Sequence, residues 1–146
     1  MKKIDQFKGR YFFLSNFYPC DIYIDIDGEE LHFKSSEAYY QGMKCPERIK
    51  EFEDLDPDQA KQLGKKVKLR EDWEEIKDSI MLAVVYRKFS KIPELKEQLL
   101  ATGDMYLEEG NNWNDRYWGT VNGKGKNQLG RTLMQVRDVL RNENED

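Results

Sequence analysis

One short segment carries polar side chains whose types and spacing suit chemistry. In "SSEAYYQGMK", Glu37, Tyr40, Gln41 and Lys44 recur at steps of three and four residues, so a helix would place them on one face. Carboxylates, lysines and amides are the groups in this chain that could carry a reaction, and a carboxylate can transfer protons. A capping acid with a solvent-exposed Glu–Lys pair has the same spacing and remains the alternative. The two adjacent tyrosines make this face more aromatic than an exposed face requires.

A second acid lies between indole rings in "WNDRYWG". Asp115 is flanked by Trp113 and Trp118, and an acid that such rings desolvate has a raised pKa suited to proton transfer. The alternative is that Asp115 caps the turn around Gly119. Trp73, at the start of a predicted helix, has a core role and a stacking role as equal alternatives.

The segment "NGKGKNQLG" is the candidate for binding phosphate. Gly125 frees the backbone, Lys124 and Lys126 bring positive charge, and the helix predicted after them would offer unpaired N–H groups to an anion. The same residues also suit an ordinary solvated turn. Together with the tryptophans, this segment is predicted to form a wall for a flat, phosphorylated ligand, with the "FFLSNF" segment on its other side. The predicted substrate-binding residues are Phe13, Asn16, Phe17, Tyr40, Gln41, Trp113, Trp118, Gly119, Lys124, Gly125, Lys126 and Asn127.

Metal and triad chemistry find little support in the sequence. The single histidine, His32, is predicted as an ordinary strand residue, which leaves no His-rich zinc site and no Ser-His-Asp triad. Cys20 and Cys45 have no second pair and are predicted to be reduced thiols. A divalent metal held by Asp104, Glu108, Glu109 and Asp115 is an alternative, but their spacing matches no EF-hand loop. We therefore expect no metal and no cofactor.

Composition limits the class of protein. The 146 residues are 38% hydrophobic and 36% charged, as expected for a soluble cytoplasmic protein. The longest apolar runs, such as residues 80–86, are far shorter than the roughly 20 residues that cross a bilayer. A net charge of −4 disfavours non-specific binding to duplex nucleic acid, although a local basic pocket can still hold phosphates.

The elements that must position these residues are mainly helices. Alternating isoleucines before Asp27-Gly28 and apolar residues after it predict a β-hairpin over residues 20–33. Helical periodicity and capping residues mark the rest of the chain, with a short strand in "DMYLEEG". The predicted helices cover residues 36–45, 57–64, 71–89, 93–102 and 127–140. The sequence therefore predicts an α+β fold, predominantly helical, with a small N-terminal antiparallel hairpin, in a single domain over residues 1–146.

Five ordered segments resemble the NADAR family of YbiA-like proteins. They are "FLSNFYPC", "SSEAYYQGMK", "LGKKVKLREDWEEIK", "LLATGD" and "NDRYWGTVNGKGKNQLGRTLMQVR", which extend from about residue 7 to residue 137. The resemblance implies a mostly helical, YbiA-like fold and an N-glycosidase acting on ribosyl-amine bonds. The substrates it implies are phosphorylated early intermediates of riboflavin synthesis, or ADP-ribose on the exocyclic amine of guanine, which nucleic acid can carry.

The same resemblance implies roles for four residues. The family's proposed catalytic acid corresponds to Glu37, its D/N-W-E tryptophan to Trp73, and the acid before its W-G motif to Asp115. The lysine matched to Lys44 is a candidate for covalent chemistry. Ala38 stands where relatives often have histidine, so no role is transferred to that position.

Two mechanisms fit these residues. Lys44 can exchange onto the imine of a ring-opened ribose and release the amine. Alternatively, Glu37 and Asp115 protonate the leaving amine and activate water directly. A non-catalytic module that binds ADP-ribose or a related nucleotide is the competing function, and an interaction protein without a pocket is a third.

Overall fold

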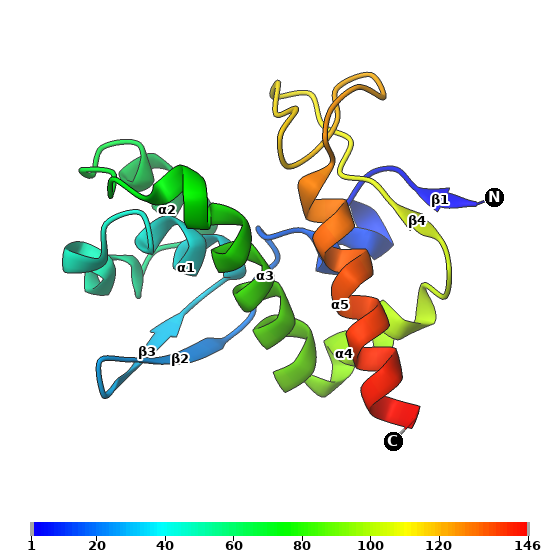
Figure 1. Cartoon of the computed structure of the whole chain (residues 1–146), viewed down its shortest axis with the longest axis horizontal. Helices are drawn as coiled ribbons and strands as arrows, with labels where there is room; N and C mark the ends of the chain where they lie inside the picture. Colours follow the sequence, from blue (N-terminus) through cyan, green and yellow to red (C-terminus); the bar gives the residue numbers. More distant parts are fainter. Residues whose placement is uncertain (1, 146) are drawn as a thin grey trace. The chain divides into compact units, whose positions relative to one another are not determined.

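The computed structural model describes residues 2–145, and packing divides the chain into two compact units (Figure 1). The terminal unit holds the chain up to Ser15 and again from Val85 onward, and the central unit is Asn16–Val84. The chain passes between them after Ser15 and within helix α3 (Trp73–Lys91). The single domain predicted over residues 1–146 stays a prediction.

The central unit begins with the predicted hairpin. Strands β2 (Ile22–Ile26) and β3 (Glu29–Phe33) pair antiparallel. Asp27 and Gly28 connect them with φ angles of 53° and 82°, a left-handed pair that suits a tight hairpin turn. Ile22, opposite Phe33 in the register, is buried with it, so one face of the hairpin contributes to the core.

Three short helical segments follow the hairpin. Helix α1 (Ser36–Gly42) begins at Ser35, whose hydroxyl accepts a hydrogen bond from the backbone N–H of Ala38 at 3.1 Å. The 3₁₀ segment η2 (Pro46–Phe52) was not predicted. Helix α2 (Pro57–Gly64) begins with a capping box in which Asp56 and Gln59 bond each other's backbone N–H groups.

The end of α1 corrects the sequence-based expectation of a helix to residue 45. The helix ends at Gly42, where an added Cβ would lie 2.9 Å from Ile49, and Cys45 donates its N–H to the Gly42 carbonyl at 3.2 Å. This turn leads directly into η2 at Pro46. Lys44 therefore follows the helix instead of lying on it.

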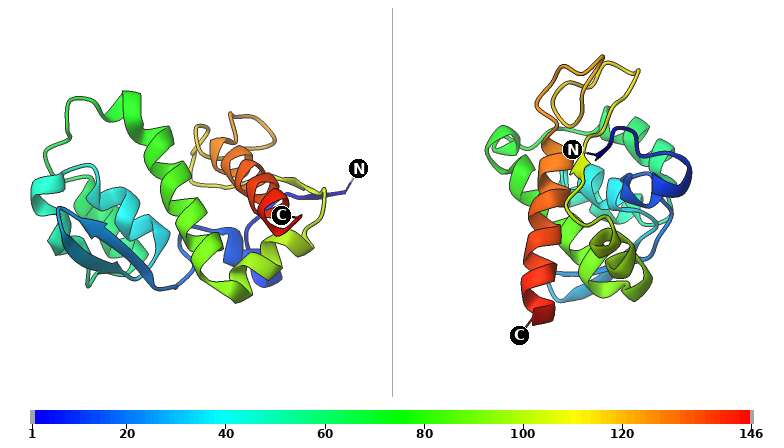
Figure 2. Two further views of the ribbon diagram at one scale, coloured as in Figure 1. Left: turned by 60° about the horizontal axis from the view of Figure 1, so that its bottom comes forward. Right: turned by 90° about the vertical axis from the view of Figure 1, so that its right-hand side faces the viewer.

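The terminal unit contains η1 (Gly9–Leu14), the end of α3, α4 (Pro93–Ala101) and α5 (Gln128–Glu145). Strand β4 (Tyr106–Leu107), predicted from the sequence, pairs in parallel with β1 (Lys3–Ile4), which was not predicted. Figure 2 shows α5 beside α4 and β4. The buried leucines of α5 and β4 form the centre of this unit's core: Leu107, Leu129, Leu133 and Leu140.

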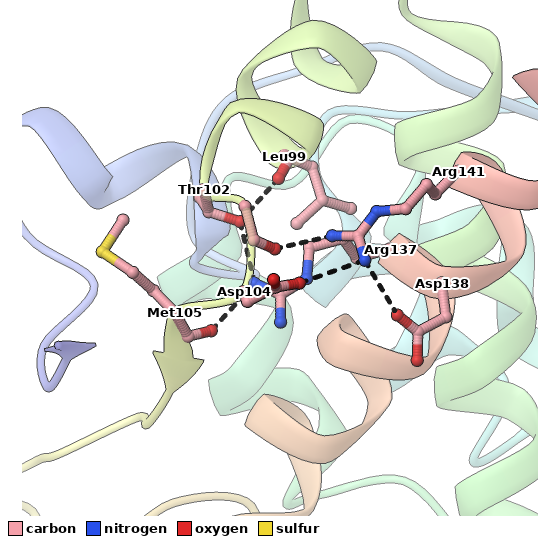
Figure 3. A network of polar contacts seen from close by, with 8 residues as sticks. Leu99, Thr102, Asp104, Met105, Arg137, Asp138 and Arg141 are labelled. Carbon is pink, nitrogen blue, oxygen red and sulfur yellow. Dashed lines mark hydrogen bonds and ion pairs between the residues drawn. The ribbon is translucent and has the colours of Figure 1, made fainter. Parts of the chain in front are cut away.

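A buried arginine joins α5 to the end of α4 (Figure 3). Arg137 donates from Nη1 to the Thr102 hydroxyl and to the Met105 carbonyl, both at 2.9 Å. One turn later, Arg141 donates to the Gly103 carbonyl at 2.7 Å. Both arginines thus donate hydrogen bonds to oxygen atoms just beyond the carboxyl end of α4. The helix dipole favours positive charge at this end.

The α+β prediction is confirmed: helices dominate, and β2–β3 is an antiparallel hairpin. Among the helices of residues 2–145, none is long and apolar enough to cross a bilayer.

Candidate active site

Glu37 and Gln41 form a buried polar pair in the central unit. Glu37, only 8% exposed, accepts at Oε2 a hydrogen bond from Nε2 of Gln41 at 2.6 Å. The two residues are one helical turn apart on α1, as the spacing predicted. The alternative that Glu37 is a solvent-exposed capping acid is therefore wrong, because Glu37 is buried.

Asn16 supports the start of the same helix. Its carbonyl accepts the backbone N–H of Glu37 at 3.1 Å, and its side-chain oxygen accepts the Ser36 hydroxyl at 2.9 Å. Its amide nitrogen also reaches the sulfur of Met81 at 3.3 Å. These contacts assign Asn16 to positioning the first turn of α1.

Lys44 lies over two aromatic rings. Its Nζ is 5.8 Å from the ring centroid of Tyr40 and 5.9 Å from that of Trp73, within the range of a cation–π contact. The two rings are buried and tilted by 59°, with centroids 5.1 Å apart. Trp73 thus has the core role that the sequence left open, and its stacking role toward a ligand stays a prediction.

The surroundings of Lys44 favour its neutral form. Burial is the main cause that lowers the pKa of this amine, because the charged form loses hydration. Glu37 acts in the opposite direction, whereas the positive charges of Lys61, Lys65 and Lys77 lower the pKa further. A lysine of lowered pKa beside a buried acid is the arrangement that covalent catalysis on an imine needs.

A glycine of α2 sits against this cluster. A Cβ at Gly64 would overlap the side-chain oxygen of Gln41. That oxygen is buried and has no hydrogen-bond partner within the described chain. The close approach therefore fixes the Gln41 amide and, through it, the carboxylate of Glu37. Sequence reasoning missed Gly64, although a glycine inside a capped helix was a usable signal.

The two phenylalanines predicted near this site belong to different units. Phe17, in the central unit, is half-buried and has the ammonium of Lys61 5.8 Å from its ring centroid. Phe13, in the terminal unit, is buried and packs edge-on against Phe89 at 6.4 Å.

In the terminal unit, Asp115 holds a turn. Its Oδ1 accepts the backbone N–H groups of Tyr117 at 3.0 Å and Trp118 at 2.9 Å. Trp118 is half-buried and packs edge-on to Tyr117, whereas Trp113 is 50% exposed. The capping role that the sequence left open is thus present, and the catalytic role of Asp115 stays a prediction.

The start of α5 requires a correction. The predicted phosphate site relied on unpaired N–H groups there, but the N–H groups of Gln128 and Leu129 donate to the carbonyls of Tyr117 and Trp118 at 3.0 and 2.9 Å. Those of Lys126 and Asn127 are likewise paired with carbonyls of the same loop. These backbone N–H groups already donate to carbonyls of the loop, so they are not available to bind an anion as predicted.

The other residues predicted on this loop shape it. Gly119 and Gly125 make close backbone contacts, since a Cβ at either would overlap a carbonyl oxygen, and Gly125 has a φ of 146°. Buried Asn127 bonds the N–H of Glu109 and the carbonyl of Leu107. Lys124 and Lys126 are exposed.

Beside this loop the terminal unit contains a polar cavity of about 370 Å³ that the sequence did not predict. Glu108, which accepts the Thr120 hydroxyl and the Lys3 ammonium, lies in its wall with Asn111 and Asn122. Neither Trp113 nor Trp118 is among the lining residues. Across the part of the chain that the structure describes, no three His, Cys, Asp or Glu side chains gather as metal ligands.

The family model named NADAR domain matches residues 4–141. A riboflavin biosynthesis protein of Vibrio vulnificus is 40% identical over 134 residues, covering 88% of this chain and 35% of its own length. The chain thus spans about a third of that relative. An N-glycosidase of Nostoc punctiforme is 36% identical over 138 residues, covering 88% of this chain and 85% of the relative.

A solved structure supports the same relationship. The NMR structure of the Escherichia coli protein YbiA matches with a TM-score of 0.85 and 33% identity, over 99% of this chain and 88% of YbiA. The chain therefore belongs to the NADAR family, in which relatives such as the Nostoc protein carry the name N-glycosidase.

Proposed function

We propose that this protein hydrolyses the bond between ribose C1 and an amine in a phosphorylated, nucleotide-like substrate. The observation that carries the proposal is the buried Glu37–Gln41 pair beside Lys44, whose pKa is lowered by burial. The substrate is ADP-ribose attached to guanine or a ribosylaminopyrimidine phosphate. The name of the Vibrio relative, a riboflavin biosynthesis protein, supports the second.

The first step opens the sugar. The nitrogen lone pair forms a C1=N iminium as the bond from C1 to the ring oxygen breaks, and Glu37 supplies the proton to that oxygen. The neutral amine of Lys44 then adds to C1. Proton transfer to the substrate nitrogen allows the amine product to leave, and C1 remains bound to Lys44 as an iminium. Water adds to this carbon, and collapse of the adduct frees Lys44 and the sugar aldehyde, which closes again.

The rings of Tyr40 and Trp73 suit the covalent intermediate. The iminium carries its positive charge at Nζ, the atom that lies 5.8 and 5.9 Å from the two ring centroids. The rings thus stabilise the charged intermediate, while burial lowers the pKa of the resting amine. Asp115, in the other unit, remains the predicted second acid.

The test combines turnover with chemical trapping. The protein is incubated separately with an oligonucleotide carrying ADP-ribosylated guanine and with a ribosylaminopyrimidine phosphate, and the released amine is measured by chromatography. Borohydride added during turnover should reduce the iminium and leave the sugar on the peptide that contains Lys44, detected by mass spectrometry. Lys44→Arg should abolish the adduct, and the matched exposed control Lys91→Arg should retain it.

Glu37→Gln should lower kcat by about 10² while binding stays nearly intact, as expected for a positioned acid. Normal turnover by Lys44→Arg without any trapped adduct would refute the covalent route. Binding of ADP-ribose without release of amine from either substrate would instead support a nucleotide-binding module.

A further inference from the structure

One segment of the central unit is strongly cationic. Residues 61–70, "KQLGKKVKLR", contain five basic residues and no acid, although the whole chain has a net charge of −4. Arg70 forms an ion pair with Asp72 at 2.7 Å. Lys65, Lys66 and Lys68 are exposed, and within the described residues no acidic side chain pairs with them. These three lysines of the basic segment therefore present positive charge that no ion pair among the described residues neutralises.

Both ends of the basic segment are fixed beside the candidate active site. Near its start, Gly64 packs against the side chain of Gln41. At its end, Arg70 donates its backbone N–H to the carbonyl of Lys44 at 2.9 Å and its guanidinium to the carbonyl of Met43 at 3.4 Å. The exposed lysines thus lie in a short segment whose two ends both contact residues 41–44.

Burial, and not the neighbouring positive charge, is the main cause that lowers the pKa of Lys44. Lys61 and Lys65, one helical turn apart, both act on Lys44 through their charge. A phosphorylated substrate needs a cationic contact, and the first N–H groups of α5 are already paired. Lysines are common phosphate ligands, because they act as mobile point charges.

We infer that the basic segment binds phosphate groups of the substrate next to Lys44, with Lys61 and Lys65 nearest the reacting sugar. This rests on the proposed function only in taking the ligand to be phosphorylated. The phosphate belongs either to a free nucleotide or to a nucleic acid strand. Lys66 and Lys68, farther along the segment, are placed to contact additional phosphates of a strand.

The experiment measures binding, so that it does not depend on turnover. The probes are ADP-ribose, unphosphorylated ribose, and a single-stranded oligonucleotide carrying ADP-ribosylated guanine, each titrated into the Glu37→Gln protein over a range of salt concentrations. Lys65→Gln should weaken ADP-ribose binding about tenfold, the effect of losing one charged hydrogen bond, and Lys65→Glu should weaken it more. The exposed Lys91→Gln is the matched control. It should leave the affinities for ADP-ribose and for the oligonucleotide unchanged.

The two sources of phosphate give different results. Loss of ADP-ribose affinity in Lys65→Gln supports contact with a free nucleotide. Loss of oligonucleotide affinity in Lys66→Gln/Lys68→Gln, with a salt slope smaller by about 1.4 for two single-strand phosphate contacts, supports contact with a strand. If the lysine variants fold and bind both phosphorylated probes as the parent does, or if the parent binds neither, the inference is overturned. Binding that depends on these lysines, in a protein that never releases an amine, would refute the proposed function alone.

Discussion

The Cα of Gly64 lies directly against the side-chain oxygen of Gln41, and a methyl group at position 64 would overlap that oxygen. Gln41 in turn donates to the carboxylate of Glu37 at 2.6 Å. A residue that contacts no proposed reacting atom is therefore linked through one side chain to the proposed catalytic acid.

Gly64→Ala should reduce kcat more than it changes KM. Alanine favours the helix over glycine by about 1 kcal/mol, but its methyl group must displace the Gln41 amide and disturb the hydrogen bond to Glu37. Steady-state kinetics with thermal unfolding separates the two effects. The double variant Gly64→Ala/Gln41→Ala removes the overlap, so it should recover stability but not turnover. Unchanged kcat in Gly64→Ala would show that Gln41 does not position Glu37.

The rate should depend on pH through Lys44. Only the neutral amine attacks, so kcat/KM should rise as pH increases through the pKa of Lys44, which burial places below its usual value of about 10.4. Lys61→Gln removes a positive neighbour and should move this inflection to higher pH. Lys96→Gln, a change in the other unit, should leave it in place. An inflection that does not move would show that Lys44 is not the titrating nucleophile.

Two substitutions at Asp115 distinguish its structural role in the turn from its predicted role as a catalytic acid. Asn keeps the oxygen that accepts the N–H groups of Tyr117 and Trp118, so Asp115→Asn should fold with near-normal stability, whereas Asp115→Ala should lose about 1 kcal/mol. If Asp115 is the second acid, turnover by the folded Asn variant should fall by about 10². Full turnover by Asp115→Asn would restrict this residue to holding the loop.

Trp118→Ala should weaken the binding of ADP-ribose by about 1–3 kcal/mol, the effect of losing one stacking surface for a base. Trp118 is half-buried against Tyr117 and is thereby held in one orientation. Calorimetric titration measures the change, with Trp113→Ala as the comparison on the same loop. A folded Trp118→Ala protein with unaltered affinity would exclude this indole from the binding surface.

Glu108 should contribute stability that depends on pH. Hydrogen bonds from Thr120 and then Lys3 lower the pKa of this buried carboxyl, so the folded state favours the carboxylate. The contribution is fully present above the unfolded pKa of about 4.3 and is lost as pH falls through the lower folded pKa. Thermal unfolding should therefore show the largest difference between wild type and Glu108→Gln above about pH 5. The exposed Glu97→Gln should differ little from wild type at any pH, and a Glu108→Gln difference that grows in acid would contradict this assignment.

Local features of the fold were predictable because their causes lie within a few residues. Asp27-Gly28 determines the hairpin turn, and the caps at Ser35 and Asp56 mark where α1 and α2 begin. The parallel pairing of Lys3 with Tyr106 was not predictable, because no local pattern specifies a two-residue strand whose partner is about a hundred residues away.

The candidate site shows the same limit. The spacing of Glu37 and Gln41 was enough to predict that they share one helical face, and the structure shows that they are also hydrogen-bonded. The prediction that the helix continues to Lys44 was wrong, because α1 ends at Gly42, which packs against Ile49. Lys44 contacts Tyr40 and Trp73 through its long side chain instead of through helical register. A glycine inside a capped helix was visible in the sequence, but its contact with Gln41 is tertiary and could not be predicted from local pattern.

The amides of residues 126–129, at and just before the start of α5, donate to the carbonyls of residues 116–119, and this pairing has a consequence for hydrogen exchange. These amides lie next to a glycine- and asparagine-rich loop that composition alone would place among the fastest-exchanging parts of the chain. Their bonds, at 2.8 to 3.2 Å from Lys126 to Leu129, join the loop to the helix, so deuterium can enter only when both open together. We therefore expect the loop that holds Trp118 to open together with the helix behind it, so its amides should exchange more slowly than its composition suggests.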